Sequence, residues 1–311
     1  MQLLVRQIRW EAAGVVSLIL VDPIGQDLPG WEPGAHIDLT VGDGSVRQYS
    51  LCGDPEDRKS YRIGVLREAD GRGGSRFVHD RLRVGALIEV AGPRNHFPFD
   101  PPSHTRIRFV AGGIGITPLI PMIRDAESRG LDWKLTYGGR SRASMAFLDE
   151  LDSVRVHVHP ADEAGPIDLD TALGDPCRDT AIYTCGPSRL LDAIEERASS
   201  WPRGALHLER FSAPPAAVPA AGDGPFEVVA KRSGITVTVP ADGTILKTLE
   251  DAGVSTQSSC SEGICGACET LVVEGRPDHR DHVLTEEEKE GGEYIMICVS
   301  RARTERIVLD I

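Results

Sequence analysis

Four cysteines near the C-terminus have the residue type and spacing of a metal-cluster site. Cys260, Cys265 and Cys268 are spaced C-x4-C-x2-C, and Cys298 follows 30 residues later. This is the plant-type ligand pattern of a 2Fe–2S cluster. Glycines between the ligands let backbone N–H groups approach the sulfurs. A disulfide pair or a zinc site is the alternative, but zinc sites favour C-x2-C pairs that histidine often completes, and this stretch has one such pair.

Two glycine-rich turns that precede expected helices are candidate anion sites. One is Gly71-Arg-Gly-Gly-Ser75, before a helix expected over residues 76–82 with Ser75 as its N-cap. The other is Gly112-Gly-Ile-Gly-Ile-Thr-Pro118, which follows an apolar strand and places Pro118 near the first turn of the next helix. The start of a helix offers free N–H groups and a positive dipole to a phosphate. The second turn does not match the Rossmann fingerprint G-x-G-x-x-G.

These motifs and two others follow one another in a fixed order. Arg47-Gln-Tyr-Ser-Leu-Cys52 ends one expected strand, and Thr184-Cys-Gly-Pro187 ends another. In this order, nearly all of the 311 residues resemble the phthalate dioxygenase reductase family, whose members feed electrons to oxygenases. Residues 225–311 look like a plant-type ferredoxin domain, and the preceding part looks like the flavin and pyridine-nucleotide domains of a ferredoxin reductase. The resemblance implies FMN, NADH or NADPH, and a 2Fe–2S cluster as cofactors.

The resemblance implies a flavin site built from the first strand-end motif and the first glycine-rich turn. An arginine can bind phosphate in a bidentate way, and an aromatic ring can cover the apolar isoalloxazine. The alternatives are an empty glycine-rich turn and, for the phenylalanine that closes the second domain, a core or linker-anchoring residue. A single phosphate loop implies FMN, and an adenine further out stays open. The residues assigned to FMN are Arg47, Tyr49, Ser50, Gly73, Gly74, Ser75 and Phe211.

The resemblance also implies a nicotinamide nucleotide site at the second glycine-rich turn and the Cys-Gly-Pro turn. No catalytic nucleophile is implied, and a small buried thiol is the alternative for the cysteine. A loop of arginines after residue 137 falls near the expected adenosine ribose, where a cation can hold a 2′-phosphate. Solvated arginines there would leave NADH as the donor, and the sequence leaves both readings open. The residues assigned to NAD(P)H are Gly112, Gly113, Gly115, Thr117, Arg140, Ser141, Arg142, Cys185, Gly186 and Pro187.

The pattern of apolar residues predicts the elements that position these motifs. Short alternating segments over 2–8, 15–21, 36–41, 61–66 and 86–90 predict an antiparallel β-barrel. Beyond a proline break near residue 103, buried-strand runs over 106–111, 133–137, 155–159 and 180–184 alternate with helices over 118–129, 145–151 and 188–197. This alternation predicts an α/β domain with a parallel sheet. Strands over 226–230 and 236–239 and a helix near 245–252 predict a compact α+β unit around the cysteine loop.

The sequence therefore predicts a multidomain chain. Residues 1–102 form an FMN-binding β-barrel, residues 103–211 an NAD(P)H-binding α/β domain and residues 225–311 the 2Fe–2S ferredoxin domain. Residues 212–224 contain three prolines and two glycines, which is typical of a semi-stiff linker.

Composition and charge exclude several functions. No apolar run approaches the ~18 residues of a membrane span, and the alternating N-terminus lacks a signal-peptide core, so we expect a cytoplasmic protein. The net charge of −13 argues against nucleic acid as a partner. Residues 225–311 hold 16 Asp and Glu against 9 Lys and Arg, which favours docking of a basic partner near the ferredoxin domain. Solubility is the alternative reason for this charge.

The cofactor set predicts a function. A hydride carries two electrons at once, whereas a 2Fe–2S cluster accepts one electron at a time. A flavin can do both, so it must lie between them and convert the two-electron transfer into one-electron transfers. We predict an NAD(P)H-dependent reductase that passes single electrons to a separate terminal oxygenase, either a Rieske non-haem iron oxygenase or a haem-thiolate monooxygenase. The alternatives are a redox-sensing flavin and iron–sulfur module without catalytic flux, and a reductase that releases free reduced flavin.

Overall fold

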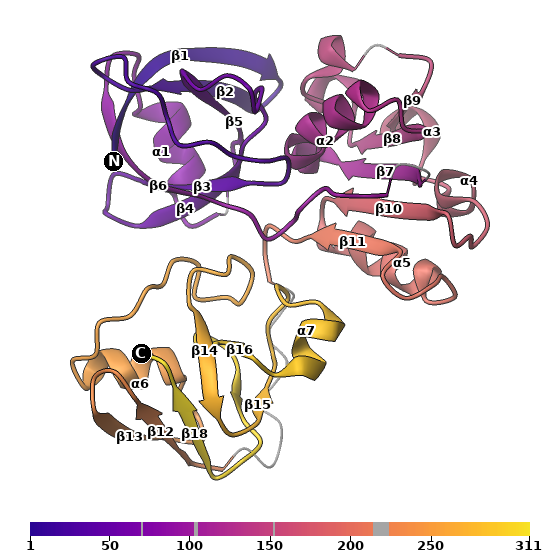
Figure 1. Cartoon of the computed structure of the whole chain (residues 1–311). Helices are drawn as coiled ribbons and strands as arrows, with labels where there is room; N and C mark the ends of the chain where they lie inside the picture. The colour runs from indigo at the N-terminus through magenta and orange to yellow at the C-terminus, as the bar shows by residue number, and fades with distance from the viewer. Residues whose placement is uncertain (70, 103–104, 152, 214–223) are drawn as a thin grey trace. The chain divides into compact units, whose positions relative to one another are not determined.

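The computed structural model describes residues 1–69, 71–102, 105–151, 153–213 and 224–311 (Figure 1). The chain forms two compact units, Met1–Phe211 and Ser212–Ile311. In the described part of the chain, no helix has the length and hydropathy that a bilayer crossing requires. The predicted boundary at residues 103–104 and most of the predicted linker, residues 214–223, lie outside the described residues.

The first sheet is an antiparallel barrel with the strand order β4-β3-β6-β1-β2-β5. A bridge between Leu51, which follows β4, and Ile63 on β5 joins the two ends of this order. Alternate residues of β2 and β5 point into a core of aliphatic and aromatic side chains, because successive side chains of a strand face opposite sides. The strands are β1 (Gln2–Ala12), β2 (Val15–Val21), β3 (His36–Thr40), β4 (Val46–Ser50), β5 (Ser60–Leu66) and β6 (Leu87–Arg94).

Helix α1 (Gly74–Asp80) packs Val78 into the barrel core. Its N-cap residue is Gly73, whose φ of +86° is a left-handed conformation that glycine adopts readily. The prediction that Ser75 is the N-cap was wrong, because the helix begins two residues earlier than predicted, at Gly74. The Ser75 hydroxyl instead accepts a hydrogen bond from the Glu68 N–H at 3.0 Å.

The second sheet is parallel throughout, with the strand order β11-β10-β7-β8-β9. Helices cover both of its faces: α2 packs on the side of Phe109 and Tyr183, and α5 on the side of Val110 and Ile182. All six residues of β10 are buried, as expected for a strand covered on both faces. The strands are β7 (Arg106–Gly112), β8 (Trp133–Gly139), β9 (Val156–Pro160), β10 (Thr180–Cys185) and β11 (Leu206–Glu209). The helices are α2 (Ile116–Ser128), α3 (Ala161–Ala164), α4 (Leu169–Leu173) and α5 (Ser188–Ala198), with a 3-10 turn at Gly113–Gly115.

The helix predicted over residues 145–151 was wrong. Two 3-10 turns, Arg142–Ser144 and Leu148–Glu150, occupy this region. Phe147 between them has φ +63°, and a left-handed residue cannot continue a right-handed helix. Strand β11 had no counterpart among the predicted strands.

The unit Ser212–Ile311 has a mixed five-stranded sheet with the order β13-β12-β18-β14-β16. Helix α6 buries Ile245, Leu246 and Leu249 against this sheet. A capping box between Thr285 and Glu288 starts α7. The strands are β12 (Phe226–Ala230), β13 (Ile235–Val239), β14 (Glu269–Glu274), β16 (Tyr294–Met296) and β18 (Arg306–Leu309), and β15 (Pro277–Asp278) pairs with β17 (Arg301–Ala302). The helices are α6 (Ile245–Asp251) and α7 (Glu286–Gly291). The predicted combination of antiparallel barrel, parallel α/β sheet and C-terminal α+β unit is confirmed.

Candidate functional site

The structure brings together the two motifs assigned to the flavin. Arg47 lies on β4, and its guanidinium donates to the Arg72 carbonyl in the glycine-rich turn at 2.7 Å. A Cβ on Gly74 would lie 2.5 Å from Cγ of Arg47, so only glycine lets the arginine stem pass the start of α1 at this distance. The cation and the free N–H groups of the helix start therefore share one place. That combination fits a phosphate group.

Two further residues of the flavin motif differ in their surroundings. Tyr49 is half-buried, and burial raises the pKa of its phenol to about 12, so it stays neutral. Ser50 is buried, and its hydroxyl donates a hydrogen bond to Oε2 of Glu209 at 3.3 Å.

Phe211 is 41% exposed and is therefore not a core residue. Its role as a cover for the flavin stays a prediction.

The two nucleotide motifs meet at the carboxyl ends of β7 and β10. The register pairs Ala111 with Cys185, so the turns that follow the two strands are neighbours. A Cβ on Gly115 would lie 2.3 Å from the Cys185 carbonyl oxygen, and a Cβ on Gly112 would lie 2.6 Å from Cδ of Pro187. Glycine at both positions thus lets the turns pack closely. The chain leaves β7 for β8 on one side, while β10 lies on the other, and ligands bind at such a switch point in open α/β sheets.

Thr117 connects the nucleotide motif to the barrel. Its hydroxyl donates to the Ile114 carbonyl at 2.9 Å, and its methyl group lies only 2.7 Å from the point that a Cβ on Gly64 of β5 would occupy. The ring of Phe147 also contacts Gly64, and the Arg62 guanidinium lies 4.8 Å from the centre of that ring. These contacts join the second sheet to the barrel wall beside its flavin motif.

Glu209 is a candidate functional residue that the sequence reasoning missed. It ends β11, beside Cys185 in the register of β10 and β11. Glu209 is half-buried as a whole residue, yet protein groups surround its carboxyl. This desolvation raises the pKa of the carboxyl to about 8, although the Ser50 hydrogen bond acts in the opposite direction. The only signal in the sequence was a glutamate inside the motif that precedes the proline-rich segment.

Cys185 itself is fully buried. Desolvation raises the pKa of its thiol well above the ordinary value, and the Glu209 carboxyl, when ionised, adds to this effect. The side chain therefore stays a neutral thiol. That the chain uses no catalytic nucleophile stays a prediction.

Arg140, Ser141 and Arg142 follow the end of β8, where Gly138 pairs with Gly112 of the nucleotide motif. Nε of Arg142 is 3.8 Å from Oε1 of Glu163, and both side chains are more than half exposed. The Arg140 carbonyl accepts a hydrogen bond from the Asp162 N–H at 3.1 Å. The loop thus lies against α3, and the Glu163 carboxylate of this helix neighbours Arg142.

The four cysteines of the predicted cluster converge in the C-terminal unit. Each is 4% exposed. The pairing of Glu269 with Met296 aligns β14 and β16, and it brings the segment after β16 beside the cysteine loop. The Ile297 N–H reaches the Cys268 carbonyl at 3.5 Å, so Cys298 lies next to the other three residues.

The thiols also interact with one another. The Cys260 sulfur accepts the Glu262 N–H at 3.3 Å, and side-chain hydrogen bonds link it to Cys265 and Cys298. These two bonds lower the pKa of the Cys260 thiol. Among the described residues, no three His, Cys, Asp or Glu side chains surround a place for one metal ion. A 2Fe–2S cluster takes four soft thiolate ligands, shared between two irons. The four cysteines fit this set of ligands.

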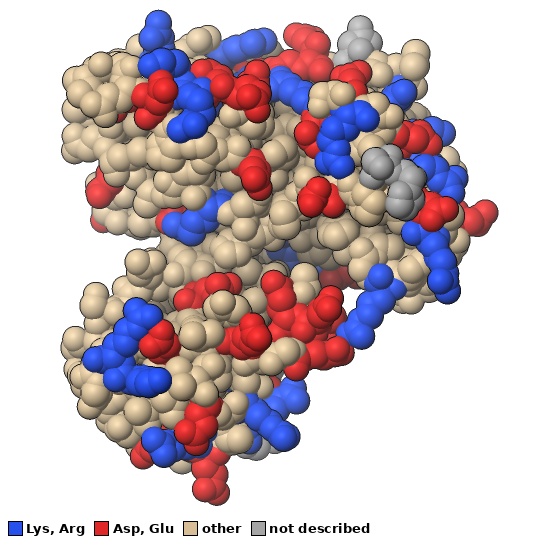
Figure 2. Space-filling view, in the orientation of Figure 1, with Lys and Arg blue, Asp and Glu red and all other residues tan. Residues whose placement is uncertain are grey.

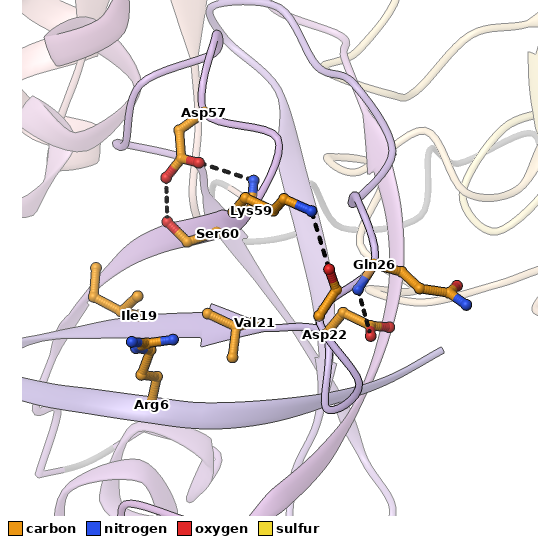
Figure 3. Close-up of a pocket in the computed structure, with 9 residues that line it drawn as sticks. Arg6, Ile19, Val21, Asp22, Gln26, Asp57, Lys59 and Ser60 are labelled. Carbon is orange, nitrogen blue, oxygen red and sulfur yellow. Dashed lines mark hydrogen bonds between the residues drawn. The ribbon is translucent and has the colours of Figure 1, made fainter.

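A surface hollow of about 370 Å³ lies on the outside of the barrel (Figure 3). Its polar groups bind one another: Asp57 accepts from the Ser60 hydroxyl at 2.6 Å, and Asp22 accepts from the Gln26 N–H at 3.0 Å. Lys59 pairs with Asp27 at 2.6 Å. None of the residues assigned to a cofactor lines this hollow, and we assign no function to it.

Comparison with known proteins agrees with this geometry. Residues 228–303, which include all four cysteines, match the family described as "2Fe-2S iron-sulfur cluster binding domain". The chain is 43% identical over 306 residues to the phenoxybenzoate dioxygenase subunit beta of Ectopseudomonas oleovorans, covering 96% of this chain and 95% of that protein.

Solved structures extend the similarity to the whole fold. One is described as "phthalate dioxygenase reductase: a modular structure for electron transfer from pyridine nucleotides to 2Fe-2S". It has a TM-score of 0.71 and 39% identity, covering 100% of this chain and 98% of that one. An intact type IV self-sufficient cytochrome P450 monooxygenase has a TM-score of 0.95 and 45% identity. That match covers 100% of this chain but 41% of the longer P450 chain.

Proposed function

Because the chain belongs to the phthalate dioxygenase reductase family and is an electron-transfer oxidoreductase, we propose that it oxidises NADH or NADPH, with FMN as its flavin, and passes single electrons to a partner oxygenase. The observation that carries this proposal is the hydrogen bond between Ser50 and Glu209. Ser50 belongs to the flavin motif, and Glu209 lies beside Cys185 of the nucleotide motif. A nicotinamide and a flavin ring bound at these motifs would therefore share one place.

When bound, the flavin supplies the chemistry that turns one two-electron hydride transfer into two one-electron transfers. The residues of the chain bind the cofactors and orient them. Arg47 and the N–H groups at the start of α1 hold the phosphate, and Gly112 and Gly115 keep the nucleotide turns close to each other. Ser50 holds the proton of its hydroxyl toward Oε2 of Glu209, whose raised pKa lets it keep a proton at neutral pH. Cys260, Cys265, Cys268 and Cys298 hold the cluster as thiolates.

The partner is a terminal oxygenase, either a Rieske non-haem iron oxygenase or a haem-thiolate monooxygenase. A dioxygenase and a cytochrome P450 monooxygenase occur among the names of the similar proteins, which supports both candidates. Acidic side chains gather over α7 of the C-terminal unit (Figure 2), where Glu286, Glu287 and Glu288 form the first turn. A partner with a basic face would be attracted to this surface. We also place the protein in the cytoplasm, because the three cysteines outside the cluster motif, Cys52, Cys177 and Cys185, form no disulfide and a reducing compartment suits free thiols.

Two measurements test the proposal. The purified chain should contain two irons and two acid-labile sulfides together with FMN, and it should reduce cytochrome c continuously with NADH or NADPH. Replacement of Cys298 by Ser should remove the cluster and cytochrome c reduction but leave the flavin bound. Zinc without labile sulfide would contradict the cluster assignment. A loaded protein that changes redox state but shows no turnover would support the redox-sensing alternative instead.

A further inference from the structure

A buried acidic residue lies behind the cysteine loop. The side chain of Asp281 is 0% exposed. One carboxylate oxygen accepts hydrogen bonds from the N–H groups of Leu284 at 2.9 Å and Val283 at 3.2 Å. The other accepts the Ser300 hydroxyl at 3.3 Å. Burial of a carboxylate is costly unless hydrogen bonds compensate for the lost water, so a role for this side chain is expected.

The groups that hold this carboxylate are neutral donors. They are two backbone N–H groups and one hydroxyl. His279 lies on its other side, with Nδ1 at 3.7 Å from Oδ1, and neither ring nitrogen of His279 has a hydrogen-bond partner among the described residues. The Asp281 carboxylate is thus buried, and none of the hydrogen bonds described above comes from a Lys or Arg side chain.

Asp281 connects the two segments that carry the cluster ligands. On one side, the N–H of His282 donates to the Gly263 carbonyl at 2.8 Å, inside the loop of Cys260 and Cys265. A Cβ on Gly263 would lie 3.2 Å from Cα of Asp281, so the two backbones are in direct contact. On the other side, Ser300 follows Cys298 by two residues and donates to the carboxylate.

We propose that Asp281 is a positioning residue for the cluster. It holds the loop of Cys260, Cys265 and Cys268 against the segment of Cys298. Its buried negative charge also opposes the arrival of an electron and so lowers the reduction potential of the cluster, because net charge and outer-shell contacts tune that potential. This inference rests on the proposed function, which supplies the cluster.

The test compares two Asp-to-Asn variants of the full-length chain. Asp281→Asn keeps the shape of the side chain but removes its charge. Asp278→Asn is the matched control, because Asp278 lies in the same segment but is partly exposed and pairs with Arg280 and Arg303. Iron and sulfide content, the EPR spectrum of the reduced cluster and a redox titration are measured for both.

We expect Asp281→Asn to shift the potential to a more positive value and to change the EPR spectrum, while Asp278→Asn matches the unchanged chain. Loss of the cluster from Asp281→Asn alone would support the positioning role. Ser300→Ala gives a second test, because it keeps the charge but removes the bond between the carboxylate and the Cys298 segment, together with the bond that the Ser300 hydroxyl accepts from the Arg280 N–H at 3.1 Å. It should release iron to a chelator at least about fivefold faster, since one hydrogen bond alone has about that effect.

Identical potentials and spectra for the two Asp variants would overturn the effect of the charge. An unchanged rate of iron release from Ser300→Ala would overturn the positioning role. Absence of labile sulfide from the unchanged chain would overturn the proposed function as well, so the two failures are distinguishable.

Discussion

At the scale of single residues, Glu209 is the side chain whose environment differs most from that of an ordinary surface glutamate. Its carboxyl has a pKa raised to about 8 by desolvation, and it accepts the hydroxyl of Ser50 from the opposite sheet. A proton held there at neutral pH removes a negative charge from the place where a hydride donor and a flavin would meet. That charge state is accessible to measurement.

We expect Glu209→Gln to change how the stability of the flavin-loaded protein depends on pH. The folded pKa lies above the unfolded value near 4.5, so the folded state retains a proton that the unfolded state releases. The wild-type chain therefore loses stability relative to the variant as pH rises from about 4.5 to about 8, by at most ~1.4 kcal/mol per pH unit. Thermal melts across this range measure the difference. The exposed Glu196→Gln is the control, and parallel curves for Glu209→Gln and wild type would contradict the burial of this carboxyl.

The preference for NADH or NADPH also depends on single residues, the arginines that follow β8. Arg142 is already paired with Glu163, and a 2′-phosphate held by Arg142 would have to approach this carboxylate. We expect NADH to be preferred, and Glu163→Gln to raise kcat/KM for NADPH while leaving NADH within a factor of about two. A strong NADPH preference that falls ten- to a hundredfold in Arg140→Ala/Arg142→Ala would show instead that the arginines bind the phosphate, at about 1.5–3 kcal/mol for each contact.

At the scale of elements, the nucleotide site depends on how closely two strand-end turns approach. Gly115 starts α2 with φ −62°, a conformation that any residue adopts. Its need for glycine is therefore steric, because a Cβ would lie 2.3 Å from the Cys185 carbonyl oxygen. The turn after β7 and the turn after β10 can keep their contact only without this side chain.

Gly115→Ala should consequently separate the two turns and impair use of the nucleotide. We expect a large fall in kcat/KM for the nucleotide, with flavin and iron content unchanged because the flavin motifs and the cysteines lie elsewhere. Gly291→Ala is the matched control: it adds the same methyl group where no atom lies within 4 Å. Steady-state kinetics with ferricyanide as acceptor give the comparison. Equal kinetics of the two variants would contradict the packing argument.

At the scale of the whole molecule, the chain divides the work between its two units. The flavin and nucleotide motifs all lie in Met1–Phe211, and the four cysteines lie in Ser212–Ile311. The further division of the first unit at residues 102 and 103 stays a prediction, although its barrel and its parallel sheet are separate sheets.

A chain that ends after Ala213 should keep its flavin and reduce ferricyanide with NAD(P)H, but it should fail to reduce cytochrome c. The reason is that the two-electron chemistry needs the first unit, whereas one-electron delivery to a protein acceptor needs the cluster. Flavin absorbance and the two acceptor assays check this. Loss of ferricyanide reduction from a folded, flavin-loaded truncation would contradict the division of labour.

The sequence by itself determined what depends on neighbours along the chain. The spacing of three cysteines predicted the iron–sulfur cluster, and the period of apolar residues predicted the three kinds of sheet. The flavin and the nucleotide followed from the family resemblance that the glycine-rich and strand-end motifs carry. Spacing and period reflect local geometry, which a short segment carries with it. The misplaced N-cap at Ser75 and the helix predicted across Phe147 show the limit, because cap position and a left-handed backbone depend on surrounding contacts.

Only the tertiary structure decided the contacts between distant segments. Ser50 and Glu209 are 159 positions apart, and Asp281 reaches both cluster segments through residues 18 to 19 positions away. No pattern in the sequence marks such pairs, since their distances are set by strand order and register. Desolvation of a carboxyl likewise depends on the side chains that fold around it. The raised pKa of Glu209 and the burial of Asp281 therefore exist only in the folded chain.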